Sequence, residues 1–274
     1  MTITLSAGDC TAVVDATAGG RVAQIYVDDQ PLLIGPDDLT NGSGAPSALP
    51  IARGLFPMAP WAGRIGSGKF TFDGIAHQLG INIRDSEGKG RDHAIHGTVF
   101  TRPWTVLEQT GSSLSMLCPL TGALDWPYEG TARQHIQVRD SSIVFALTVE
   151  SALASFPAEV GWHPWFRKPQ RLSFEPTAMY ERDEMDLPTG ELIAPSTGPW
   201  DDCFLNSEPV TLHYDRPQVS EIRVESDCDH WMIFDEPTHA TCVEPQSGPP
   251  DAFRLGPHVV KPGDPLQRTM SISW

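Results

Sequence analysis

The segment QHIQVRDSSIVFALTV, residues 134–149, decides the fold class that we expect for this chain. In both of its halves large apolar residues recur at every second position, which is the period of a β-strand with one buried face. Between the halves, Arg139-Asp140-Ser141 supplies the polar residues that are typical of a tight turn. The segment therefore predicts two antiparallel strands joined as a hairpin.

The same period occurs in other short runs. Residues 21–27 and 69–72 alternate in this way, and the second run ends at the hairpin dipeptide Asp73-Gly74, after which residues 76–79 are again strand-like. Twenty-four glycines and twenty-five prolines leave little room for long helices. We therefore expect an all-β chain that forms one domain over residues 1–274, a large, mostly antiparallel β-sandwich.

Two irregular stretches interrupt these patterns. Residues 36–50 are rich in Gly, Ser, Asp and Pro, and residues 82–92 are mostly charged and contain glycine. Both compositions are typical of loops, and neither is long enough to link two domains.

Composition restricts the partners of the chain. Thirty-five acidic and nineteen basic residues give a formal net charge of −16, which repels nucleic acid and anionic membrane surfaces. A neutral small molecule suits this field, whereas an anionic substrate would need local arginines such as Arg64 and Arg91. Since no apolar run approaches the roughly 20 residues of a membrane span and residues 1–6 do not resemble a signal peptide, we expect a cytoplasmic protein, monomeric or homodimeric.

The spacing of the five cysteines does not indicate disulfide bonds or a zinc site. The cysteines are widely spaced, odd in number and include no CxxC pair. Neither disulfide bonds nor a zinc site is therefore expected, and the thiols should be reduced and mostly packed.

The segment VGWHPWF, residues 160–166, is the first candidate for chemistry. Pro164 favours an extended conformation at His163, so the imidazole is expected at a strand end rather than in a helix. Trp162 and Trp165 could stack on a flat apolar face of a ligand. The alternative is a histidine kept in an aromatic core by one hydrogen bond.

Two further stretches place a polar side chain among residues that break regular structure. Arg64 lies in a segment rich in Pro and Gly, and its guanidinium could bind ligand oxygens or could simply tie down a loop. In the run His93-Ala94-Ile95-His96-Gly97, positions three apart face opposite sides of a strand, so a metal pair is not expected. We interpret His96 as a hydrogen-bonding residue and His93 as peripheral.

Two carboxylate segments complete the set. Asp201 and Asp202 lie beside Trp200 and Phe204, where a carboxylate could accept hydrogen bonds from sugar hydroxyls or could belong to a solvated turn. Glu244 ends an apolar run ahead of a Pro/Gly-rich loop. A carboxylate at such a position is a candidate base, and a structural ion pair is the alternative.

Together these segments resemble the aldose 1-epimerase (galactose mutarotase) family in order and spacing almost from end to end. The resemblance rests on six segments, which are Arg64 with its flanking residues, His96-Gly97, residues 161–166, residues 201–204, Glu244-Pro245-Gln246 and the closing residues 260–264. It implies a β-supersandwich of the galactose mutarotase type, no metal or organic cofactor, and interconversion of the α and β anomers of a free aldohexose, a small-molecule sugar.

The resemblance also implies roles for single residues. Glu244 would be the base that takes the proton from the C1 hydroxyl, and His163 the acid that protonates the ring oxygen, with His96 assisting there. Arg64 and Asp201 would bind sugar hydroxyls. Separately, an opposite charge favours the imidazolium, so nearby carboxylates such as Glu244 and Asp201 are expected to raise the pKa of His163 from its ordinary value of about 6.5.

The sequence departs from the family pattern at three places. Many members have Asn where Gly63 stands, an aromatic–serine or proline–tyrosine pair where Pro164-Trp165 stands, and Asp-His-Asn where residues 201–203 are Asp-Asp-Cys. These departures concern the preferred sugar more than the acid–base pair.

Three alternatives stay open at this point. A hexose-6-phosphate 1-epimerase would need a cationic pocket; Arg91 and Arg102 favour it, and four lysines in a strongly negative chain disfavour it. A non-catalytic sugar-binding domain would not require both an acid and a base. A metal-dependent β-barrel enzyme is the third.

Overall fold

The computed structural model describes residues 1–39, 50–85 and 90–274, and this part of the chain is almost entirely β-structure. The first sheet has eleven strands, with β4 attached beside β3: β1 (Thr2–Ala7), β2 (Cys10–Asp15), β3 (Arg21–Val27), β4 (Gln30–Pro31), β5 (Leu55–Met58), β15 (Gly161–Arg167), β23 (Ala240–Gln246), β22 (His230–Phe234), β19 (Asp201–Leu205), β17 (Ala178–Arg182) and β18 (Pro188–Ile193).

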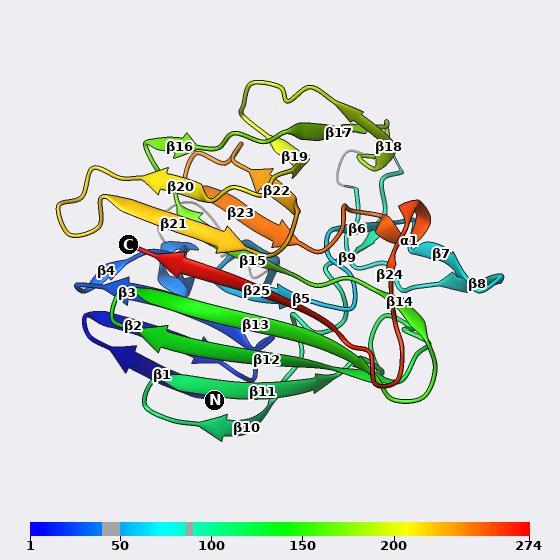
Figure 1. Ribbon diagram of the computed structural model, residues 1–274, viewed down its shortest axis with the longest axis horizontal. Coiled ribbons are helices and arrows are strands. Elements are labelled where there is room, and N and C mark those ends of the chain that lie inside the picture. The colour runs from blue at the N-terminus through cyan, green and yellow to red at the C-terminus, as the bar shows by residue number, and fades with distance from the viewer. Residues whose placement is uncertain (40–49, 86–89) are drawn as a thin grey trace.

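A second sheet of eight strands packs against the first and lies in front of it in Figure 1. In spatial order its strands are β10 (Thr105–Gln109), β11 (Ser113–Pro119), β12 (Gly130–Arg139), β13 (Ser142–Ser151), β25 (Leu266–Ser273), β21 (Glu221–Ser226), β20 (Val210–His213) and β16 (Arg171–Ser173).

Several short elements lie outside the two large sheets. Three two-stranded sheets pair β14 (Phe156–Ala158) with β24 (His258–Val260), β6 (Arg64–Gly66) with β9 (His93–Ile95), and β7 (Lys69–Phe72) with β8 (Ile75–Gln78). The helical elements are α1 (Ala252–Leu255) and the 3₁₀ turns η1 (Pro36–Leu39) and η2 (Pro50–Ala52).

The prediction of an antiparallel β-sandwich is confirmed. The named strand pairs of the described chain are antiparallel. Residues 134–149 form most of the β12–β13 hairpin, with Ile136 opposite Phe145. Asp73 and Gly74 form the predicted turn between β7 and β8 with φ values of 51° and 76°, which suit Gly and are tolerated by Asp.

The two predicted loops lie only partly within the described residues. Residues 40–49 and 86–89 are outside them. The described part of the first stretch contains η1, and the described part of the second includes an antiparallel bridge between Ile83 and His93.

The core lies between the two sheets. Phe145 and Leu147 of β13 face it from one side, and Trp162, Phe166 and Val243 of β15 and β23 face it from the other. However, β15 and β23 are buried on both faces, because a second apolar cluster that includes Phe56, Phe100 and Trp165 covers their outer face. This covered outer face provides the floor of the candidate site.

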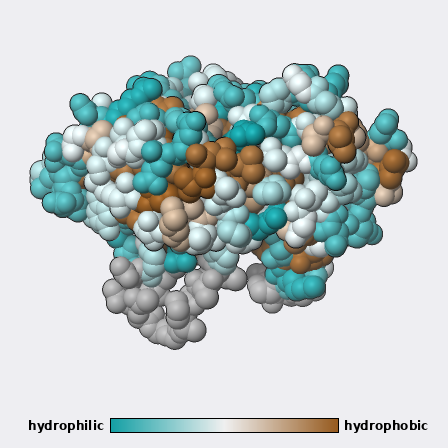
Figure 2. Space-filling model, turned by 90° about the horizontal axis from the view of Figure 1, so that it is seen from below, coloured by the Kyte–Doolittle hydropathy of each residue, from teal (hydrophilic) through white to brown (hydrophobic). Residues whose placement is uncertain are grey.

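The surface is largely hydrophilic on the face that Figure 2 shows. Figure 2 shows hydrophilic residues over much of the face viewed from below, with apolar residues gathered in a central band. Within the described residues, no helix combines the length and the apolar character needed to cross a membrane.

Candidate active site

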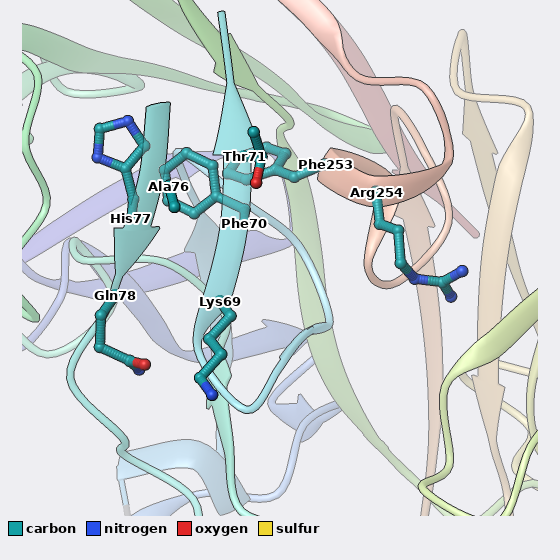
Figure 3. Close-up of a pocket in the computed structure, with 8 residues that line it drawn as sticks. All are labelled: Lys69, Phe70, Thr71, Ala76, His77, Gln78, Phe253 and Arg254. Atoms are coloured by element: carbon teal, nitrogen blue, oxygen red, sulfur yellow. The ribbon is translucent and has the colours of Figure 1, made fainter. Parts of the chain in front are cut away.

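Two cavities are candidates for a ligand site. One of about 600 Å³ lies between the β7–β8 hairpin and α1. Figure 3 shows Phe70 and Phe253 near each other in this cavity, with Lys69 and Arg254 extending away from them. Its described lining residues include no carboxylate, and Arg254 already donates to Asp251 and to the carbonyl of Pro188. This cavity therefore lacks an acid–base pair.

The second cavity, of about 260 Å³, gathers most of the predicted site residues. Its lining includes Arg64, His96, His163, Trp165, Asp201 and Glu244. These residues come from β6, from the segment after β9, and from β15, β19 and β23. Segments far apart in the sequence thus meet on the outer face of the first sheet.

The centre of this cavity is a pair of facing side chains on adjacent strands. The register of β15 and β23 pairs Gly161 with Gln246 and Trp165 with Cys242, which sets His163 opposite Glu244. His163 Nε2 lies 3.2 Å from Glu244 Oε1, and both side chains are almost fully buried. Cross-strand neighbours of this kind hold two side chains in a fixed relation.

Aromatic rings fix the orientation of His163. Phe56 of β5, which is paired with β15 directly at His163, stacks on the imidazole at 4.7 Å between ring centroids. Trp165, two positions along the same face, lies nearly parallel to the imidazole at 5.5 Å and 8°. The ring therefore has little freedom to leave Glu244.

His96 approaches His163 because of an unusual backbone. His96 and Gly97 have φ values of 59° and 79°, and a Cβ atom on Gly97 would lie 1.9 Å from the carbonyl oxygen of Ala59. Only glycine fits so close to another backbone. This turn sets the His96 ring edge-on to His163, at 5.0 Å between centroids.

Burial controls the protonation of these three groups. It lowers the pKa of His163 to about 3, and it lowers the pKa of His96 well below the ordinary value, with the charges of His163 and Arg64 adding to the effect. It raises the pKa of Glu244 well above the ordinary value, Asp201 adds to the rise, and Arg64 and the Gln246 amide oppose it. Removal from water penalises the charged form of each group.

These directions correct the expectation that carboxylates raise the pKa of His163. Desolvation outweighs the attraction of the neighbouring carboxylate. The pair of His163 and Glu244 therefore holds one proton in common over a wide pH range, with burial favouring the neutral acid and the neutral imidazole.

Arg64 and Asp201 face each other at another part of the cavity wall. Arg64 begins β6, Asp201 begins β19, and Arg64 Nη2 lies 3.7 Å from Asp201 Oδ2. Burial raises the pKa of Asp201, while Arg64 and Arg182 lower it. The two side chains, which are 19% and 25% exposed, can both reach a ligand.

The two predicted aromatic contacts have different positions. Trp165 lines the cavity, but Trp162 is fully buried in the core between the sheets. The predicted contact of Trp162 with a sugar is therefore wrong, because successive residues of a strand point to opposite faces. His93 is buried and lies away from the pair, in keeping with its interpretation as peripheral; its Nδ1 accepts from the Ser67 amide and its Nε2 contacts the Met185 carbonyl.

Among the residues that the structure describes, one group of donor atoms could hold a metal ion. A ring nitrogen of His163, the sulfur of Cys242 and a carboxylate oxygen of Glu244 lie within 4.8 Å of one another. Burial raises the pKa of Cys242 well above its ordinary value, which disfavours the thiolate, the form that binds metals. The five cysteines are buried, and the expectation that they are packed is confirmed.

Sequence reasoning missed several residues of the site. Gln246 Nε2 lies 3.4 Å from Glu244 Oε2, and the period of a strand could have placed Gln246 beside Glu244. Phe56, Met232 and Phe234 reach the site through strand pairings that no local pattern indicates.

Comparisons with known proteins agree with this geometry. A model of the aldose 1-epimerase family matches residues 1–273, so the chain belongs to the aldose 1-epimerase family. It is 23% identical over 290 residues to YihR, an uncharacterized protein of Escherichia coli (strain K12), covering 93% of this chain and 86% of that one.

Solved structures have the same fold. A galactose mutarotase-like protein from Clostridium acetobutylicum superposes with a TM-score of 0.83 at 17% identity, covering 99% of this chain and 94% of the other. Galactose 1-epimerase from Lactobacillus acidophilus NCFM gives a TM-score of 0.75 at 14% identity, covering 99% and 93%. These likenesses establish the galactose mutarotase-like fold.

Proposed function

We propose that this protein is an aldose 1-epimerase that interconverts the α and β anomers of a free aldohexose, without a metal or organic cofactor. The observation that carries the proposal is the 3.2 Å contact between His163 Nε2 and Glu244 Oε1 on the floor of a cavity. Ring opening of a hemiacetal needs one proton to leave O1 while another reaches O5, and a facing acid and base supply both transfers.

His163 and Glu244 together hold one proton, and this suits the reaction. With Glu244 ionised and His163 protonated, Glu244 takes the proton from O1 and His163 gives its proton to O5, while the C1–O5 bond breaks and the C1=O1 bond forms. The pair is then neutral, which is the arrangement that burial favours. After rotation about C1–C2, the same transfers in reverse close the ring on the other face.

His96 and Arg64 support the two ends of this transfer. Arg64 lowers the pKa of Glu244 and so favours its ionised form. His96 is kept neutral by burial, and a neutral imidazole still carries one N–H that can donate to O5. Its edge-on position beside His163 is consistent with this assisting role.

The other wall of the cavity suits a sugar. Asp201 can accept hydrogen bonds from hydroxyl groups, and Arg64 can donate to them. The Trp165 ring can cover the C–H groups of a pyranose. Galactose is a reasonable first substrate, since one protein of the same fold is named galactose 1-epimerase.

The arginines near the cavity disfavour a phosphorylated substrate. Arg64, Arg84 and Arg91 line an adjacent cavity, but Arg91 lies 2.5 Å from Asp186 and 3.9 Å from Asp85. Arg84 pairs with Asp92 at 3.3 Å. Arg102 donates to the carbonyls of Pro119 and Thr121. Arg84 and Arg91 thus face carboxylates, and Arg102 is absent from the described lining of both cavities, which leaves little net positive charge for a phosphate.

Polarimetry tests the proposal. Freshly dissolved α-D-galactose and α-D-glucose should reach their equilibrium rotation faster with the protein than without it, and glucose 6-phosphate should respond less. Faster equilibration of glucose 6-phosphate than of either free sugar would favour the phosphate alternative. Sugar binding without any acceleration would favour the non-catalytic domain.

A further inference from the structure

We infer that Arg182 is a positioning residue of this site, which holds the Asp201 carboxylate between two guanidinium groups and so sets the affinity for the sugar. The inference rests on the proposed function. Arg182 does not line the cavity in the described structure, so its effect must pass through Asp201.

The backbone directs Arg182 toward Asp201. Arg182 is the last residue of β17, which pairs with β19 through Ala178 and Met179. On its other side β17 pairs with β18, and the register shifts between Tyr180 and Arg182. A bulge of this kind turns the side chain that follows it. It brings the Arg182 guanidinium over the start of β19.

Four side chains form a row of alternating charge there. Arg182 Nη1 lies 3.6 Å from Asp201 Oδ2, the same oxygen that Arg64 Nη2 approaches at 3.7 Å. Arg182 Nε lies 3.0 Å from Asp202 Oδ1. Asp202 therefore anchors Arg182, and Arg182 balances Arg64 across the Asp201 carboxylate.

The distances explain how Asp201 stays available to a ligand. Both contacts to Asp201 exceed the roughly 2.7–3.2 Å of a direct hydrogen bond, whereas the contact between Arg182 and Asp202 does not. The two arginines hold Asp201 by charge at the same oxygen, Oδ2, without a direct hydrogen bond. A sugar hydroxyl can then donate to the carboxylate without first breaking a direct hydrogen bond to either arginine.

Loss of Arg182 should change this balance in two ways. Asp201 would be left with Arg64 alone, and the two could close into a direct pair that competes with the sugar for both groups. In addition, Asp201 is largely removed from water, and Arg182 is one of two cations that oppose the resulting rise of its pKa. The carboxyl would therefore protonate at higher pH.

The experiment compares Arg182→Met, Arg182→Lys and Asp202→Asn with wild type, using mutarotation kinetics and sugar affinity by titration calorimetry. Arg182→Met should raise KM and Kd about tenfold, the scale of a lost interaction with a charged group, and change kcat less than about threefold. Its KM should rise further as pH falls from 7 to 5, unlike that of wild type. Arg182→Lys should restore part of the affinity, and Asp202→Asn should weaken it about threefold.

Arg133→Met is the matched control, because Arg133 forms an exposed pair with Glu150 on the second sheet. It should leave KM, Kd and their pH dependence unchanged. A wild-type KM in Arg182→Met, or equal losses in kcat and KM without pH dependence, would overturn the positioning role. If Arg182→Met does not fold, an unchanged KM in Asp202→Asn overturns the role instead.

The calorimetry separates this inference from the proposed function. If the wild-type protein binds galactose or glucose but does not accelerate mutarotation, the proposed function fails, and the change of Kd in the variants still decides the role of Arg182. A wild-type protein that binds neither sugar overturns both.

Discussion

Two glutamates of this protein are equally removed from water but differ in what surrounds them. Glu244 is 3% exposed and Glu159 is 0% exposed, and burial raises the pKa of each well above the ordinary value. Glu244 faces His163 at 3.2 Å and lines the cavity. Glu159 is absent from the described lining residues, and its Oε1 lies where a Cβ on Gly248 would come within 2.1 Å.

This comparison shows that a shifted pKa alone does not mark a catalytic group. Burial perturbs both carboxyls in the same direction, because it penalises charge wherever water is excluded. Of the two glutamates, Glu244 is the one that contacts a histidine with which it can exchange a proton, and it is the one that lines the cavity where a substrate could bind. Those are properties of the surroundings, and they can be tested by changing each glutamate in the same way.

The largest effect is expected from Glu244→Gln. The amide keeps the shape of the side chain but cannot accept the proton from O1, so mutarotation of galactose should fall by roughly 100- to 10,000-fold. Glu159→Gln should change the rate less than about threefold, and both variants should keep the β-rich circular dichroism of wild type. Near wild-type polarimetric rates in Glu244→Gln would refute the acid–base assignment.

A smaller effect separates the two tryptophans of β15. Trp165→Leu removes a ring from the cavity and should raise KM by about 3- to 10-fold, the scale of an aromatic contact. Trp162→Leu should instead lower the free energy of unfolding by roughly 2–5 kcal/mol and leave KM near wild type. Kinetics and urea denaturation of both variants check this, and a raised KM for folded Trp162→Leu would speak against its core position.

The dependence of activity on pH tests the shared proton. Protonating His163 while Glu244 is neutral requires a pH near 3, and removing the common proton requires a pH near the raised pKa of Glu244. Between these limits the pair keeps one proton, so kcat/KM should show no step centred on the ordinary pKa of histidine, about 6.5. A decline centred near 6.5, the ordinary pKa of histidine, would mean that His163 titrates as an exposed imidazole.

The smallest effect concerns stability at Glu159. Since its pKa is raised in the folded protein, Glu159 contributes stability that is fully present below its unfolded pKa and is lost as pH rises through the folded value. Glu159→Gln removes this loss. Its Tm should exceed that of wild type at pH 8, by about 2–4 °C for each kcal/mol gained, and the difference should shrink toward pH 4. A Tm below wild type at pH 8 would show that Glu159 is stabilising when ionised.

Local sequence patterns were enough to predict several strands and the chemistry of single positions. Alternation over residues 134–149 predicted the β12–β13 hairpin, and the dipeptide Asp73-Gly74 predicted the β7–β8 hairpin. Both predictions were possible because strand period and turn geometry are local properties. Pro164 and Pro245, which follow His163 and Glu244, interrupt regular structure there and indicated that these two polar side chains could belong to a site. The family resemblance supplied the expected relation between them.

Which of these residues meet, and in which state of charge, depends on how the strands pair and pack. The register of β15 on β23 placed His163 against Glu244, and β5 brought Phe56 onto the imidazole. The period of a strand gives alternate faces but cannot say which one meets the core when both are buried, so Trp162 was assigned to the wrong face. Desolvation depends on everything packed around a group, and for that reason the direction of the His163 pKa shift could not be read from its neighbours in sequence.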